Sequence, residues 1–82
     1  MQINIRFFAL LREQLGCEHI EFDYQGEPTI ATLRHTLATR GDAWLALING
    51  NTLAAINHTL CQDHAIISDG DEVAFFPPVT GG

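Results

Sequence analysis

One segment of this 82-residue chain has the length and spacing of a full helix, and this segment most constrains the fold. Its apolar residues Ile30, Leu33 and Leu37 recur at helical spacing. Thr29 is a favoured N-cap residue, and Gly41 is expected to end the helix. Because a single helix buries its apolar stripe only against another element, we predict that residues 29–40 form the main helix and pack on one face of a sheet.

Most of the remaining chain has the pattern of strands, either by period-two alternation or as short apolar runs. Two shorter helical segments are expected at residues 9–15, ended by Gly16, and at residues 42–48. The resulting order, strand-helix-strand-helix-strand-strand, predicts one α+β domain with a mixed sheet over residues 1–76. The predicted strands are residues 2–8, 18–24, 53–57 and 72–76.

Two aromatic positions depart from this alternation. In the first strand Ile3, Ile5 and Phe7 share one face, whereas Phe8 lies on the face that is otherwise polar. In the last strand two phenylalanines are adjacent at residues 75–76. Since neighbouring side chains of a regular strand point to opposite faces, one of this pair is expected to point away from the core.

The charge balance excludes several classes of partner. The chain has ten acidic residues against four cations, all arginines, which gives a net charge of −6. Nucleic-acid affinity rests mainly on Lys and Arg neutralising phosphates, so we expect no nucleic-acid and no membrane partner. The longest apolar run, residues 43–48, is far shorter than the roughly 20 residues of a membrane span. Charged residues also interrupt the apolar N-terminal stretch, which argues against a signal peptide. We therefore expect a cytoplasmic globular domain.

The sequence contains no self-contained active site. Cys17 and Cys61 are too few for a disulfide framework and fit no zinc spacing, so we interpret them as small hydrophobes or surface thiols. No serine-histidine-aspartate order and no phosphate-binding glycine loop is present. We predict no metal site and no permanently bound cofactor. Four scattered histidines are interpreted as surface or loop residues: His19, His35, His58 and His64.

The pattern changes after residue 76, where the chain continues as Pro77-Pro78-Val79-Thr80-Gly81-Gly82. Two prolines cannot donate ladder hydrogen bonds and fix φ, so we predict that the last strand ends here and that residues 77–82 form a flexible, extended C-terminal tail. The terminal glycines fit a channel too narrow for any Cβ atom. The only reactive group of the tail is the α-carboxylate of Gly82. The alternative is an inert, frayed end.

Several segments together resemble the ThiS/MoaD family of sulfur carriers, in particular the small subunits of molybdopterin synthase. The most specific is the run Asp-Gly-Asp-Glu-Val-Ala-Phe-Phe-Pro-Pro-Val-Thr-Gly-Gly at residues 69–82. The agreement also includes residues 6–9, residues 12–13, residues 29–34 and residues 54–57. The resemblance implies a β-grasp (ubiquitin-like) fold, with one main helix on a mixed sheet and an extended Gly-Gly tail.

The family chemistry implies that Gly82, together with Gly81, is the functional end of the chain. By this resemblance, an E1-like adenylyltransferase is expected to use ATP to convert the Gly82 carboxylate to an acyl-adenylate. A sulfur donor, a cysteine desulfurase or sulfurtransferase, then leaves a C-terminal thiocarboxylate. The resemblance further implies that the large subunit of molybdopterin synthase receives the tail in a heterotetramer. There the sulfur would be used to form the dithiolene of molybdopterin from the cyclic pyranopterin precursor. On this reading the chain is not catalytic alone.

The resemblance also implies a partner-binding surface around the tail. It consists of Phe8, Leu60, Phe76, Pro77, Pro78, Val79 and Thr80. The alternative for the three large apolar residues is that they cover a second core layer. Arg12 and Arg34 are interpreted as solvated helix-face charges or as partners for acids across the interface. Two other functions stay open at this point: a ubiquitin-like protein modifier, which without lysine could not link to itself through that residue, and a thiamine-pathway sulfur carrier.

Overall fold

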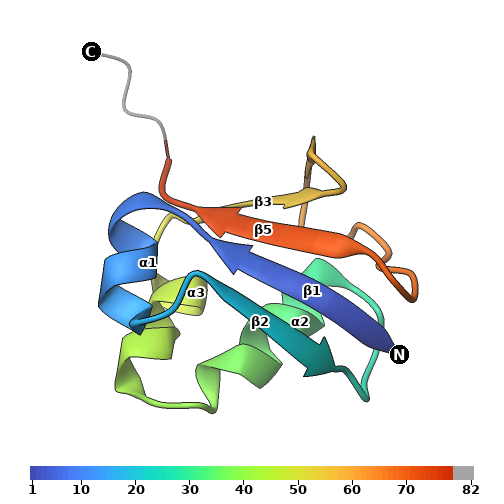
Figure 1. Cartoon of the computed structure of the whole chain (residues 1–82), viewed down its shortest axis with the longest axis horizontal. Coiled ribbons are helices and arrows are strands. Elements are labelled where there is room, and N and C mark those ends of the chain that lie inside the picture. Colours follow the sequence, from blue (N-terminus) through green and yellow to red (C-terminus); the bar gives the residue numbers. More distant parts are fainter. Residues whose placement is uncertain (79–82) are drawn as a thin grey trace.

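The computed structural model describes residues 1–78. Five strands form one mixed sheet (Figure 1). Along the chain, α1 follows β1, and α2, η1 and α3 lie between β2 and β3. The strands are β1 (Gln2–Phe7), β2 (His19–Asp23), β3 (Leu53–Ile56), β4 (Thr59–Cys61) and β5 (Glu72–Phe76). The helices are α1 (Ala9–Leu15), α2 (Ile30–Ala38), the 3₁₀ turn η1 (Asp42–Leu45) and α3 (Ala46–Asn49).

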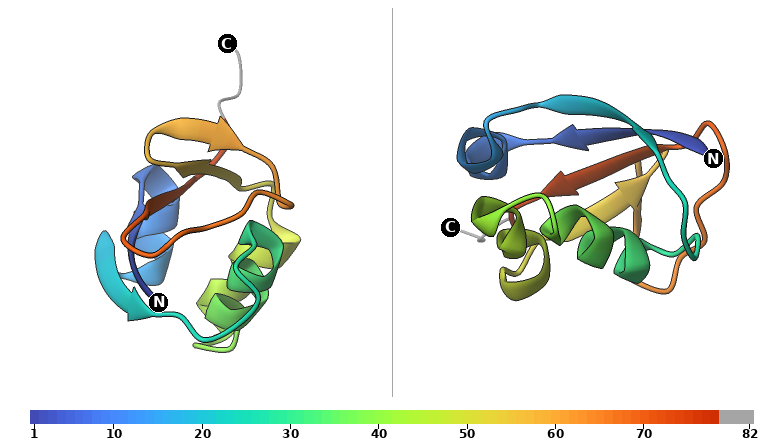
Figure 2. Two further views of the ribbon diagram at one scale, coloured as in Figure 1. Left: turned by 90° about the vertical axis from the view of Figure 1, so that its right-hand side faces the viewer. Right: turned by 90° about the horizontal axis from the view of Figure 1, so that it is seen from below.

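The strand order is β2-β1-β5-β3-β4, so the last strand along the chain lies in the middle of the sheet. β5 pairs in parallel with β1 and antiparallel with β3, whereas β2 and β4 form the two edges. Helices α2 and α3 lie on one face of the sheet, and the twisted sheet curves around them (Figure 2). The mixed sheet with one main helix packed on it confirms the predicted α+β architecture.

The core lies between the sheet and these helices. Ile3, Ile5 and Phe7 of β1 are at most 1% exposed and share one core with the apolar stripe of α2, as the alternation predicted. Phe7 packs edge-on against Trp44 of η1, with ring centroids 5.3 Å apart. Its ring also stacks on Phe75, at 6.2 Å and 16°. Such aromatic pairs stabilise beyond the area that they bury, so they fix β1, β5 and η1 against one another.

Local sequence signals define the ends of the two longer helices. The Thr29 hydroxyl accepts a hydrogen bond from the Thr32 N–H at 3.3 Å, as expected of an N-cap. Gly16 ends α1 with φ of 74°, a conformation that glycine adopts without steric cost. The main helix ends at Ala38, before the predicted residue 40, because the last turn tightens into a bond from the Arg40 N–H to Leu37 O at 3.0 Å.

The sequence reading missed strand β4. A two-residue turn, Asn57 and His58 with φ of 49° and 70°, joins it to β3 in register Ile56↔Thr59. Positive φ at both positions is the signature of a type I′ hairpin, and Asn and His tolerate this region better than most residues. The Asn57 side chain also accepts a bond from the Glu72 N–H at 3.0 Å, which ties the turn to β5.

Arg34 corrects a second expectation, because it is neither a solvated charge nor a free interface residue. Its side chain is 11% exposed and lies over the Phe75 ring, with the guanidinium carbon 5.2 Å from the ring centroid. It donates to Leu47 O at 2.8 Å, to both oxygens of Thr52, and to Asp63 at 2.9 Å. One buried cation therefore joins α2 to α3, to the start of β3 and to the loop after β4.

Replacing this cation tests its role in the fold. Arg34→Ala leaves the carbonyl of Leu47 and the oxygens of Thr52 without their donor, so we expect a loss of roughly 2 to 4 kcal/mol in the free energy of unfolding. Asp63→Asn is the matched control: the side chain of Asp63 is 59% exposed, and partly solvated ion pairs contribute about 1 kcal/mol or less. Urea denaturation of both variants measures the difference, and equal losses would contradict the assignment.

Candidate functional site

The predicted tail begins at the end of the central strand. Pro77 and Pro78 directly follow β5, which confirms that the last strand ends at residue 76. Pro77 is partly buried and Pro78 is exposed. The sequence-predicted residues Val79, Thr80, Gly81 and Gly82 lie outside the described residues. The chain therefore enters this segment from a strand that is hydrogen-bonded on both sides.

The two adjacent phenylalanines of β5 point to opposite faces, as the strand parity required. Phe75 is fully buried in the core, whereas Phe76 is partly exposed on the other face. On that outer face Phe76 pairs in register with Leu53 of β3. Leu53 was not predicted as a site residue, because its position opposite Phe76 depends on the β3–β5 register.

An apolar surface, here called the sheet-face patch, lies on the outer face and consists of Phe8, Leu53, Leu60 and Phe76. Phe8 is 45% exposed and Leu60 is 64% exposed. The Phe8 N–H donates to Phe75 O at 3.2 Å, so Phe8 continues the β1–β5 register beside Phe76. The structure thus brings Phe8, Leu60 and Phe76 to one face, as the sequence predicted. Phe8 and Leu60 are exposed and do not cover a second core layer.

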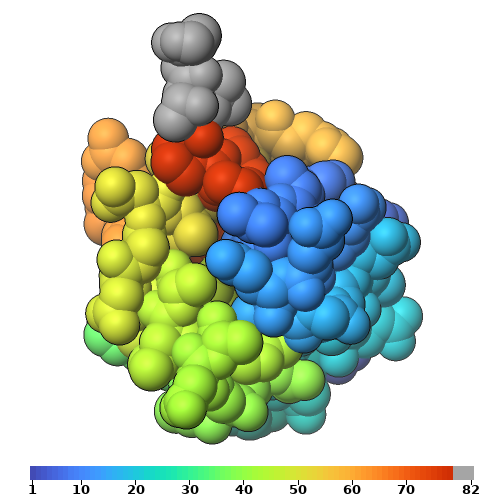
Figure 3. Space-filling view, turned by 90° about the vertical axis from the view of Figure 1, so that its left-hand side faces the viewer, coloured from blue at the N-terminus to red at the C-terminus, as the bar shows by residue number. Residues whose placement is uncertain are grey.

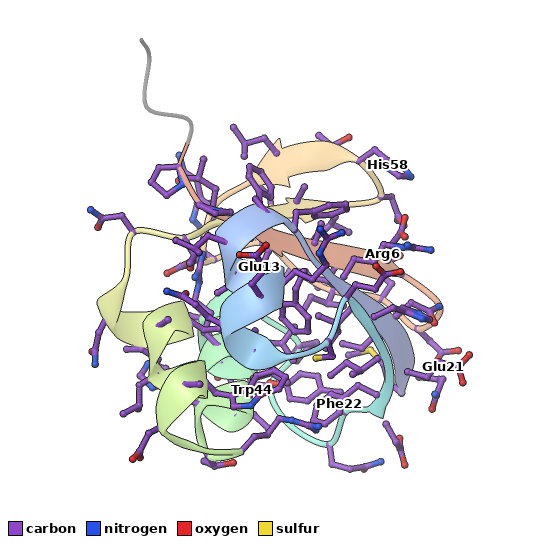
Figure 4. The ribbon with its side chains drawn as sticks, turned by 60° about the vertical axis from the view of Figure 1, so that its left-hand side comes forward. Arg6, Glu13, Glu21, Phe22, Trp44 and His58 are labelled. Carbon is purple, nitrogen blue, oxygen red and sulfur yellow. The ribbon has the colours of Figure 1, made fainter. Side chains whose placement is uncertain are left out.

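The rest of the outer face is polar. Arg6 pairs with Glu72, and the His58 Nε2 lies 3.1 Å from the same carboxylate. Figure 4 shows Arg6, Glu21 and His58 directed away from the space in which Phe22 and Trp44 lie. The face is therefore divided into a charged part over β1, β2, the start of β5 and the β3–β4 turn, and an apolar part beside the tail.

A groove opens on the other side of the tail, with a volume of about 240 Å³. Figure 3 shows α1 in blue and the segment that follows α3 in yellow on its two sides, with the last described residues in red. We call it the tail-root groove. Its lining is Leu10, Leu11, Gln14, Ala46, Gly50, Asn51, Thr52, Pro77 and Pro78.

Gly50 sets the path of one groove wall. A Cβ atom at this position would lie 2.7 Å from the carbonyl oxygen of Ala46, closer than backbone contacts allow. The Gly50 N–H donates to this same oxygen at 3.0 Å and ends α3. A glycine is needed here because the chain turns directly against the last turn of the helix.

The histidines and cysteines lie outside the tail-root groove and the sheet-face patch. All four histidines are exposed, as predicted, and both cysteines are free and partly buried. Burial raises the pKa of the Cys61 thiol, which disfavours the reactive thiolate. Within residues 1–78, no group of three or more His, Cys, Asp or Glu side chains is arranged to hold a metal ion.

The charged residue predicted on α1 is engaged within the chain. Arg12 lies 3.6 Å from Glu18, and both side chains are about half exposed or more. Such a pair is only weakly stabilising, so it leaves Arg12 available to another acid. No titratable side chain lines the tail-root groove. Around the tail, the described residues therefore provide contact surface rather than acid-base groups.

Known proteins resemble this chain over almost its whole length. The profile of the ThiS family matches residues 5–82. The chain is 48% identical over 83 residues to the molybdopterin synthase sulfur carrier subunit of Escherichia coli (strain K12), covering 98% of this chain and 99% of that protein.

Solved structures share the fold. The crystal structure of SAMP1 from Haloferax volcanii superimposes with a TM-score of 0.82 at 25% identity over the whole of both chains. A chain in the protein–protein complex of subunits 1 and 2 of molybdopterin-converting factor from Helicobacter pylori 26695 gives a TM-score of 0.70 at 26% identity, again over both whole chains. The mixed sheet, its covering helix and these matches show that the chain has the β-grasp fold and belongs to the ThiS family.

Proposed function

We propose that this chain is the sulfur-carrier small subunit of a molybdopterin synthase. One observation carries the proposal: the identity of 48% to a molybdopterin synthase sulfur carrier subunit spans 98% of the chain. The family match extends to Gly82, and the segment that leads there leaves the centre of the sheet between two apolar surfaces. These features suit a domain that delivers its C-terminus to other proteins.

The chemistry of the carrier lies in the α-carboxylate of Gly82. A free carboxylate is a poor acceptor for sulfur because its oxygen is a poor leaving group. We infer that a carboxylate oxygen attacks the α-phosphate of ATP on a partner adenylyltransferase and releases pyrophosphate. A persulfide on a cysteine desulfurase or sulfurtransferase then attacks the acyl carbon and displaces AMP, and a thiol reduces the resulting acyl disulfide, which releases the thiocarboxylate and leaves the thiol as a disulfide. The thiocarboxylate sulfur is a soft, ionised nucleophile, comparable to a thiolate.

The tail must then meet its acceptor inside another protein. We propose that the large synthase subunit supplies the acid-base groups and the binding site for the cyclic pyranopterin precursor, and that two small and two large subunits assemble. Two transfers of sulfur would complete the dithiolene of molybdopterin. On this proposal the chain acts as a sulfurtransferase only within the complex, and we propose that it does so in the cytoplasm.

The sheet-face patch is the proposed docking surface for the large subunit. Its large apolar side chains lie on one face of the sheet, beside the end of β5 where the tail begins. Large apolar residues at the centre of an interface provide most of the binding free energy, and surrounding polar residues contribute mainly to specificity. The charged part of the outer face, with Arg6 and Glu72, borders the patch.

A protein-modifier function is the second candidate, favoured by the similarity to SAMP1. A modifier forms an isopeptide bond between Gly82 and a target lysine, whereas a carrier releases the carboxylate after each transfer. Covalent adducts on cell proteins, trapped through a tag at the N-terminus, would favour the modifier. A thiamine-pathway carrier would share the thiocarboxylate but bind another acceptor enzyme.

The thiocarboxylate is the first measurable consequence. After incubation with the cognate adenylyltransferase, ATP and sulfide, intact-mass analysis should show one oxygen exchanged for one sulfur at Gly82. Deleting Gly82, or adding one alanine after it, should abolish this exchange because the reactive carboxylate is displaced along its channel. Thermal unfolding should be the same for all three chains, and normal sulfur incorporation by either variant would overturn the proposal.

The sheet-face patch provides a second test. Leu60→Asp should weaken binding to the large subunit about tenfold or more, because it places a charge within an apolar contact surface. Ile66→Asp is the matched control: both side chains are 64% exposed, and Ile66 lies in the loop after β4, bridged to Thr29 at the start of α2. Titration calorimetry measures both affinities. If both variants bind the large subunit with equal affinity, the patch is not part of the interface.

A further inference from the structure

We propose that the tail-root groove holds an apolar side chain of the large synthase subunit and forms a second anchor, separate from the sheet-face patch. This inference rests on the proposed sulfur-carrier function. It concerns contacts made by α1 and by the loop after α3, none of which belongs to the patch. The groove and the patch would then both contact the large subunit, one on each side of the tail.

The chemistry of the lining selects an apolar occupant. Leu11 is 2% exposed and belongs to the core, whereas Leu10 is 58% exposed beside the opening. Ala46 and the two prolines add apolar surface. Gln14, Asn51 and Thr52 supply the polar side chains, the first two of them exposed, and no charged group lines the space. An apolar centre with polar groups around it is the arrangement found at protein–protein contacts.

The size of the groove suits a side chain rather than a small-molecule substrate. Its volume of about 240 Å³ is several times the roughly 30 Å³ that one water occupies in the liquid. It is below the range of about 300–1,000 Å³ that is typical of small-molecule sites. One leucine, methionine or phenylalanine side chain from a protein surface is therefore the matching occupant.

The walls are held in place before any partner binds. Thr52 accepts hydrogen bonds from Arg34, and the same guanidinium binds Leu47 O of α3 at 2.8 Å. Gly50 bonds to Ala46 O, so the loop is fixed against the helix that it leaves. A preformed groove loses little conformational entropy on binding, which is what makes a small contact effective.

Continuity with the tail identifies the partner. Pro77 and Pro78 line the groove and also begin the segment that leads to Gly82. On the opposite side Phe8 immediately precedes α1, which carries Leu10. A protein that takes up the tail therefore contacts this region together with the patch. Sulfur transfer needs the tail to be held through the chemical step, and the Helicobacter pylori structure is of a complex between two subunits. These points favour the large subunit.

Binding of exposed-residue variants tests the inference. Leu10→Asp places a charge in the apolar opening, so we expect the affinity for the large subunit to fall about tenfold or more. Leu10→Ala removes the same apolar surface without a charge and should lower the affinity severalfold. Ile66→Asp, with the same change in charge at a residue remote from the lining, should bind within twofold of the unchanged chain. Circular dichroism checks that each variant is folded.

The outcomes separate this inference from the proposed function. If the unchanged chain binds the large subunit and both Leu10 variants bind as tightly, the groove proposal is wrong and the carrier function stands. If the unchanged chain neither binds nor gains sulfur, the carrier function fails and the groove proposal fails with it. Concentration-dependent dimers in sedimentation that are lost in Leu10→Asp would assign the groove to a second copy and would also overturn the proposal.

Discussion

The parallel pairing of β1 with β5 is the contact on which the tail root depends. It joins segments from the two ends of the chain, with Asn4 opposite Glu72 and Phe7 opposite Phe75. Because both strands run in the same direction, they end together. The start of α1 and the start of the tail are therefore placed side by side, so this register brings Phe8 beside Phe76 in the patch and Leu10 beside Pro77 and Pro78 in the groove.

Arg34 is the second interaction on which the structure depends, and it joins the helices to the loops beside them. Its stem and guanidinium fill the space between Phe75 and the loops, and its donors satisfy carbonyl and hydroxyl oxygens that would otherwise be buried unpaired. Among the residues that the structure describes, no buried side-chain nitrogen or oxygen lacks a hydrogen-bond partner. The short helical turns near the groove depend on this cation, since α3 alone is too short to be stable.

Local periodicity predicted most of the fold but only part of the site. Strand parity placed Phe8 on the outer face and required one phenylalanine of the 75–76 pair to face outward, because successive side chains of a strand point to opposite faces, and the family resemblance identified this residue as Phe76. β4 was missed since three residues give no readable period. Arg34 was misread because its partners come from distant loops. Leu53 and the groove depend on registers and on several separate segments, which no single stretch of sequence contains.

The central position of β5 has a mechanical consequence. A tail that enters and leaves a tight channel transmits force to its anchor each time it is withdrawn. Pulling along β5 loads its hydrogen bonds to β1 and β3 together in shear, whereas an edge strand such as β4 has one neighbour only and would peel away bond by bond. A central strand is therefore suited to anchor the tail in the proposed carrier function.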